Sequence, residues 1–105
     1  MTLGTLQLDD SALRSFCRTW HLRELSVFGS VLRDDFRPES DVDFLFTLDD
    51  PSSLTFRTWV EMEEGLAAIV GRKVDLVPRR SVETSDNPFR REHILNTAKL
   101  VYEQR

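Results

Sequence analysis

The chain has 105 residues, one cysteine and a formal net charge of −4. This length is typical of one domain with a single core, so we expect residues 1–105 to form one domain. The negative charge argues against general nucleic-acid binding, a lone cysteine excludes an internal disulfide, and no apolar run approaches the roughly 18 residues of a membrane span.

The N-terminal residues "MTLGTLQLDD" lack the charged and apolar regions of a signal peptide, so a cytoplasmic protein without membrane contact is expected. A first helix follows, with an apolar stripe at helical spacing made by Leu13, Phe16, Cys17 and Trp20. Its N-cap is one of three polar residues, Asp9, Asp10 or Ser11. Residues 25–28 then predict a short strand that ends at Gly29, with room for a helical turn after it.

A second strand is predicted from Asp41 to Leu48, where the turn sequence "DDPSS" ends it. Ser52 or Ser53 then caps a long helix, and Gly71 is placed to stop that helix. The helix is identified by its repeated apolar residues, which are Phe56, Trp59, Val60, Met62, Leu66, Ile69 and Val70.

The C-terminal third predicts a strand, a helix and a second strand. Lys73 to Val77 forms the first strand, which Pro78 closes. Asn87 and Pro88 are typical of an N-cap followed by a first-turn proline, and "LVYE" near the end predicts a short edge strand. The order of elements is therefore α-β-β-α-β-α-β, an α/β (α+β) arrangement.

Three acidic residues interrupt the apolar strands. Because side chains alternate along a strand, Asp41 and Asp43 point to one face, while Val42 and Phe44 point to the other, toward the core. Residues two apart on a strand lie roughly 6.6 Å apart, which suits two side chains converging on divalent ions. Asp75 repeats the pattern on the third strand. Three converging carboxylates repel one another unless a cation lies among them, and hard oxygen ligands favour Mg²⁺ or Mn²⁺.

The residues that follow the first strand are suited to binding phosphate. A strand that stops at Gly29 and turns into a helical segment exposes backbone N–H groups, and glycine allows a phosphate to approach the main chain. Ser30 adds a hydroxyl donor. Arg33 lies one turn further on, where its guanidinium can reach the same phosphates.

Basic residues are frequent in the C-terminal third. Such a group is usually a solvated surface, and the alternative is a contact for a triphosphate or an acidic partner. Its members are Arg72, Lys73, Arg79, Arg80, Arg90 and Arg91.

The sequence contains Gly-Ser, then ten residues, then Asp-x-Asp, and a third acid lies on a later strand. This pattern resembles the motif of the polymerase-beta-like nucleotidyltransferases. Within that superfamily the chain is similar to the minimal nucleotidyltransferases. The resemblance extends through three further stretches, "SDVDFLF", "RKVDLVP" and "HILNTAKLVYE". The resemblance implies the polymerase-beta-like fold, a small mixed sheet flanked by helices. It also implies that Gly29 and Ser30 hold ATP, and that two Mg²⁺ ions are bound by Asp41, Asp43 and Asp75.

Three hypotheses for the function follow. In the first, AMP is transferred from ATP to a hydroxyl, with Asp75 as the base. The resemblance implies that the acceptor is a tyrosine of a HEPN-domain ribonuclease toxin, so that the chain acts as an antitoxin. A separate acceptor domain does not fit within 105 residues, so a folded protein is the expected acceptor. The second hypothesis is an antitoxin that acts by binding alone. The third is a dimeric nucleotidyltransferase for small molecules. The sequence does not identify the base, the number of AMP groups added or the oligomeric state.

Overall fold

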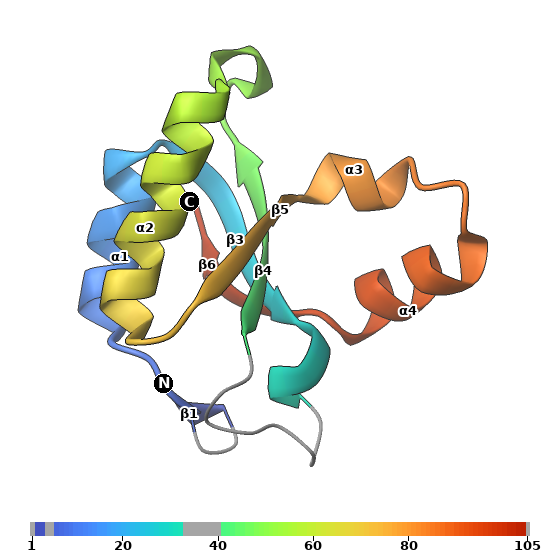
Figure 1. The fold of residues 1–105 in the computed structure, drawn as a ribbon, viewed down its shortest axis with the longest axis horizontal. Coiled ribbons are helices and arrows are strands. Elements are labelled where there is room, and N and C mark those ends of the chain that lie inside the picture. The colour runs from blue at the N-terminus through green and yellow to red at the C-terminus, as the bar shows by residue number, and fades with distance from the viewer. Residues whose placement is uncertain (1, 4–5, 33–40, 105) are drawn as a thin grey trace.

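The structure is a computed structural model that describes residues 2–3, 6–32 and 41–104. It contains six strands, four α-helices and two 3-10 turns (Figure 1). In chain order these are β1 Thr2–Leu3, β2 Leu6–Gln7, α1 Asp10–Thr19, β3 Leu22–Phe28, η1 Gly29–Leu32, β4 Val42–Leu48, η2 Pro51–Ser53, α2 Phe56–Val70, β5 Val74–Pro78, α3 Arg79–Glu83, α4 Pro88–Thr97 and β6 Lys99–Glu103.

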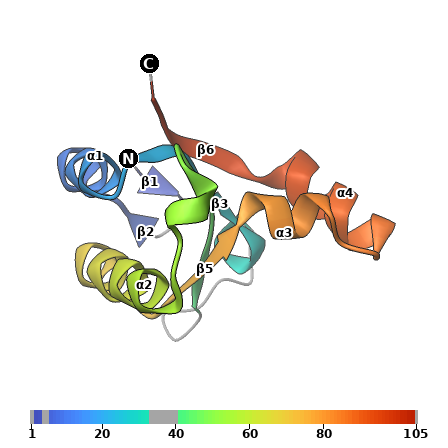
Figure 2. The same cartoon turned by 90° about the horizontal axis from the view of Figure 1, so that it is seen from above.

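The strands β5, β4, β3 and β6 lie side by side, in that order, in one mixed sheet. The pair β4–β5 is parallel and the other two pairs are antiparallel. Helices α1 and α2 cover one face of this sheet, and α3 and α4 lie on the opposite side, as Figure 2 shows from above. The expected small mixed sheet flanked by helices is therefore confirmed.

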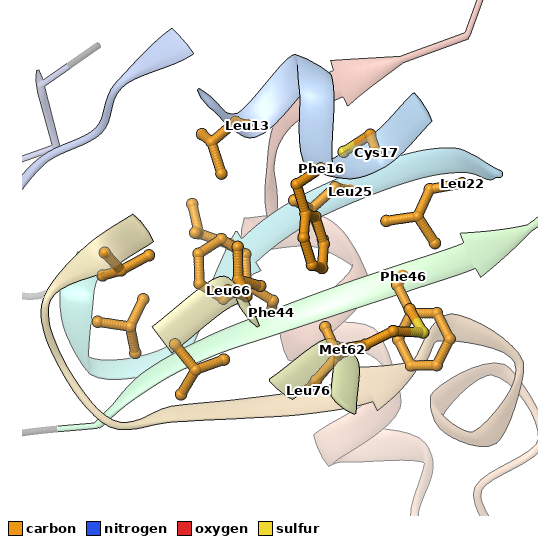
Figure 3. Close-up of a cluster of buried hydrophobic side chains, with 14 of the residues drawn as sticks. Leu13, Phe16, Cys17, Leu22, Leu25, Phe44, Phe46, Met62, Leu66 and Leu76 are labelled. Atoms are coloured by element: carbon orange, nitrogen blue, oxygen red, sulfur yellow. The ribbon is translucent and has the colours of Figure 1, made fainter. Parts of the chain in front are cut away.

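The larger core lies between the sheet and the pair α1–α2 (Figure 3). Leu66 of α2 and Phe44 of β4 are fully buried there. Cys17 of α1 has no exposed surface, and burial raises the pKa of its thiol to about 12. The thiol is therefore protonated at neutral pH and acts as a small apolar core residue, as its position in the apolar stripe predicts.

A smaller core fills the opposite face of the sheet. It is formed by Phe28, Leu45, Val82 and Ile94. Leu45 shares a face with the acidic residues of β4 and is still buried, because α3 and α4 pack over it. Asp43 and Asp75 lie on this face beyond the part that α3 and α4 cover, at the end where β4 and β5 begin.

Helix boundaries agree with the sequence prediction except at the start of α2. Asp9 caps α1, Asn87 caps α4, and Gly71 ends α2 in a left-handed conformation with φ +76°. The predicted capping of α2 by Ser52 or Ser53 is wrong. Asp50 instead holds both serines in the η2 turn. Thr55 is the N-cap of α2, and its hydroxyl accepts from the Thr58 N–H at 3.1 Å.

Two features were not predicted from the sequence: the short β1–β2 hairpin and the five-residue helix α3. Within the described ranges, every helix is too short or too polar to span a membrane.

Trp59 connects α2 to β5 through one hydrogen bond. The indole Nε1–H donates to the carbonyl oxygen of Leu76 at 2.7 Å. The indole ring also packs edge-on against Phe46, with ring centroids 6.3 Å apart. Helix α2 is thus fixed to the strand that carries Asp75.

We expect Trp59→Phe to lower the free energy of unfolding by about 1–3 kcal/mol, because it leaves the Leu76 carbonyl without its indole donor. Urea denaturation followed by circular dichroism measures this loss. Phe56→Leu serves as the control, since Phe56 is 83% exposed on the same helix. Equal stability of the parent and Trp59→Phe would show that the hydrogen bond contributes nothing.

Candidate active site

Two of the three predicted acids are neighbours on adjoining strands. Asp43 of β4 is paired with Asp75 of β5 in the parallel register and with Phe28 of β3 on its other side. Paired residues of adjacent strands lie about 4.8 Å apart and point to the same face. The carboxylates of Asp43 and Asp75 therefore lie on one face, at the end where β4 and β5 both begin.

Asp41 precedes β4 and is exposed to solvent. The next residue, Val42, donates its N–H to the carbonyl oxygen of Lys73 at 3.0 Å, so β4 and β5 are aligned from their first residues. By strand alternation Asp41 is on the same face as Asp43. No three His, Cys, Asp or Glu side chains are arranged to enclose a metal ion among residues 2–3, 6–32 and 41–104.

Gly29 ends β3 and begins η1 with a φ of +79°. A Cβ built at this position would lie 3.4 Å from Cγ of Asp43 and would collide with its Oδ2. The Asp43 carboxylate thus occupies the space where any other residue would place its side chain. Both the positive φ and this contact require glycine.

The predicted helical turn after the first strand is confirmed by η1, which contains Gly29 and Ser30. Arg33, the third residue predicted to bind the nucleotide, lies outside the described residues.

A cavity of about 310 Å³ opens beside Gly29, between η1 and α4. Phe28, Leu32 and Ile94 give it apolar walls, and Arg90, His93 and Thr97 of α4 supply its polar groups. The neighbouring Arg91 is used differently, since its guanidinium donates to the carbonyl oxygen of Ser85 at 2.9 Å. The predicted group of basic residues is therefore not one uniform surface.

Glu63 of α2 is close enough to Asp75 for the two charges to interact. Burial raises the pKa of Glu63, the negative charge of Asp75 raises it further, and Lys73 opposes the rise. The sequence indicated no role for Glu63, because only the packing of α2 on β5 places it near Asp75.

Carboxylates at this corner are suited to Mg²⁺ in their chemistry. Mg²⁺ is commonly bound by one or two carboxylates together with the phosphates of a substrate, and it does not need a cage built wholly of protein ligands. Asp43 and Asp75 provide two such carboxylates side by side, and Asp41 is two residues from Asp43. The missing side chain of Gly29 leaves room for the Asp43 carboxylate.

Residues 10–101 match the family described as "Nucleotidyltransferase domain". The chain is 42% identical over 64 residues to protein adenylyltransferase MntA of Thermococcus cleftensis, a match that covers 60% of this chain. It spans 62% of the length of that relative.

Solved structures share the fold. A crystal structure of a toxin–antitoxin with AMP-PNP has a TM-score of 0.69 and 21% identity, covering 93% of this chain and 76% of the other. A tri-AMPylated HEPN toxin of Shewanella oneidensis in complex with its MNT antitoxin gives a TM-score of 0.60 and 21% identity, covering 90% and 70%.

We expect Gly29→Ala to destabilise the protein more than Gly71→Ala does. Both glycines have a positive φ, so alanine costs about 1–2 kcal/mol of backbone strain at either position. A Cβ at Gly71 has no atom within 4 Å, whereas at Gly29 it meets the Asp43 carboxylate. Urea denaturation of both variants isolates this contact, and equal losses of stability would contradict it.

Proposed function

The chain belongs to the nucleotidyltransferase domain family, and on that basis we propose that it is a Mg²⁺-dependent protein adenylyltransferase. In this proposal residues 1–105 form a single minimal nucleotidyltransferase domain in the cytoplasm, which transfers AMP from ATP to a tyrosine of a HEPN-domain ribonuclease toxin and so acts as its antitoxin. The observation that supports it most is the pairing of Asp43 with Asp75, with Gly29 against Asp43.

The nucleotide and the metal are assigned to separate residues. The turn at Gly29 and Ser30 binds the triphosphate through its backbone N–H groups and the serine hydroxyl, and Arg33 adds a cationic donor. Asp41, Asp43 and Asp75 would hold two Mg²⁺ ions, which when bound neutralise charge on the phosphates and orient the reacting oxygens. Asp75 is on the edge strand β5, and the proposal assigns the acceptor to that side of the site.

In the transfer, the tyrosine oxygen attacks the α-phosphorus of ATP. The new bond joins that oxygen to phosphorus, and the bond from the α-phosphorus to the oxygen bridging the β-phosphate breaks, which releases pyrophosphate. The phenolic proton passes to the Asp75 carboxylate. Asp75 is exposed at the sheet edge, so the hydroxyl of an acceptor protein can reach its carboxylate.

A protein acceptor is supported by two observations. The cavity beside Gly29 holds about 310 Å³, at the small end of ligand sites, and it lies on the other side of Asp43 from Asp75. An acceptor that reaches Asp75 therefore approaches from the outside of the sheet edge. The Thermococcus relative is a protein adenylyltransferase, and the Shewanella complex contains an AMPylated toxin.

We expect Asp43→Asn to reduce AMP transfer by more than about 100-fold, the upper end of the loss seen for groups that merely support a metal ligand. Asp75→Asn should slow transfer severely and leave ATP binding nearly intact, since it removes the base. Transfer is measured with labelled ATP, and Asp86→Asn, an exposed acid between α3 and α4, is the control. Near-normal transfer by Asp43→Asn would contradict the metal assignment.

Incubation with ATP, Mg²⁺ and the cognate toxin should add AMP-sized mass increments to a toxin tyrosine, and the ribonuclease activity should fall in step. The Asp41→Asn/Asp43→Asn variant should bind the toxin without inactivating it permanently, because no covalent group remains after dissociation. Intact-mass spectrometry and a growth assay measure both effects.

The binding-only hypothesis is distinguished in the same experiment. If the double variant protects cells as fully as the parent and no mass increment forms with any NTP, neutralisation occurs by binding alone. Native mass spectrometry of the chain with and without the toxin tests the third hypothesis, which requires a homodimer.

A further inference from the structure

The cavity between η1 and α4 lies next to the proposed site but contains none of its acidic residues. Gly29 belongs to both, because it lines the cavity and also contacts the Asp43 carboxylate. Helix α4 reaches this position by packing Ile94 into the smaller core with Phe28. A ligand in the cavity therefore has one end against the turn that is proposed to bind the triphosphate.

The order of groups across the sheet shows which end of the nucleotide the cavity faces. Asp75, Asp43 and Phe28 are paired across β5, β4 and β3, and Gly29, which follows Phe28 in the chain and contacts Asp43, lines the cavity on the β3 side of Asp43. In an in-line displacement the attacking and leaving oxygens lie on opposite sides of the α-phosphorus. If the acceptor is at Asp75, the leaving group lies toward Gly29.

We propose that this cavity binds the β- and γ-phosphates of the nucleotide, which become pyrophosphate, and that Arg90 and His93 are their donors. The inference rests on the proposed function for the direction of transfer. It assigns to α4 the recognition of a triphosphate as opposed to a monophosphate.

The groups that line the cavity support a polyanion. Arg90 and His93 are three residues apart on α4 and so point to the same side, with five N–H donors on the guanidinium and at least one on the imidazole. Thr97 is not a third donor, because its hydroxyl donates to the carbonyl oxygen of His93 at 2.6 Å. Both side chains are exposed, so a polyanion can reach them from solvent.

Binding of Mg²⁺-pyrophosphate, Mg²⁺-ATP and AMP by titration calorimetry tests the proposal without any acceptor protein. Arg90→Ala should weaken binding of pyrophosphate and ATP on the order of 10- to 100-fold, the effect of losing a charged hydrogen bond, and leave AMP unchanged. Arg90→Lys should restore part of the affinity. The fold should survive, because the Arg90 N–H that is bound by Asn87 at 3.2 Å belongs to the backbone.

Arg57→Ala is the matched control. It also removes one exposed arginine, which pairs with Glu61 on α2 and does not line the cavity. If Arg90→Ala binds pyrophosphate as the parent does, or if the parent does not bind it, the proposal is overturned. If AMP is weakened as much as ATP, the cavity binds the nucleoside and not the outer phosphates.

Failure of the proposed function has a different result. In that case the parent adds no AMP to the toxin, while the dependence of pyrophosphate binding on Arg90 is still measurable.

Discussion

The parallel register between β4 and β5 is the constraint on which the rest of the site depends. It pairs Val42 with Val74 and Phe44 with Leu76, and these four side chains are buried beneath α1 and α2. Because side chains alternate, the same register makes Asp43 and Asp75 neighbours on the opposite face. A shift of one residue would place carboxylates in the core, where burying a charge is very costly. The core therefore holds the acids in position.

The second face of the sheet shows how a small domain combines packing with an open site. Leu45 and Phe28 are covered by α3 and α4, so that face is a core for part of its length. The acids lie beyond this covered part, at the beginning of β4 and β5. Helix α4 is thus both part of a core and, through Arg90, part of the wall beside Gly29.

Local patterns in the sequence were sufficient for most of the fold. The apolar stripe of α1, the proline after Asn87 and the glycine after α2 each have a direct physical cause within a few residues. The predicted start of α2 was wrong because Asp50 binds Ser52 and Ser53, so these serines were not available as caps. Helix α3 has only five residues, too few for a periodic pattern.

The residues of the candidate site also separate into those that a local sequence pattern predicts and those that it does not. Gly29 and Asp43 could be predicted because they are close in the sequence, and Asp75 because it repeats the pattern of an acid within an apolar strand. The structure places these three residues together. Glu63 was missed, because it approaches Asp75 only through the packing of α2 on β5. Arg90 was predicted only as a member of the basic group, because it lies 61 positions after Gly29 in the chain and no local pattern connects the two.

The hydrogen bond from Trp59 to Leu76 also determines how the sheet ends. The carbonyl of Lys73 faces β4, and since backbone groups alternate in direction, that of Leu76 faces outward along the free edge of β5. The indole occupies this acceptor, so another extended chain cannot pair with β5 in a regular ladder without displacing the indole. The same hydrogen bond that fixes α2 to β5 therefore hinders the addition of a strand, from a partner or in an aggregate, at the edge that carries Asp75.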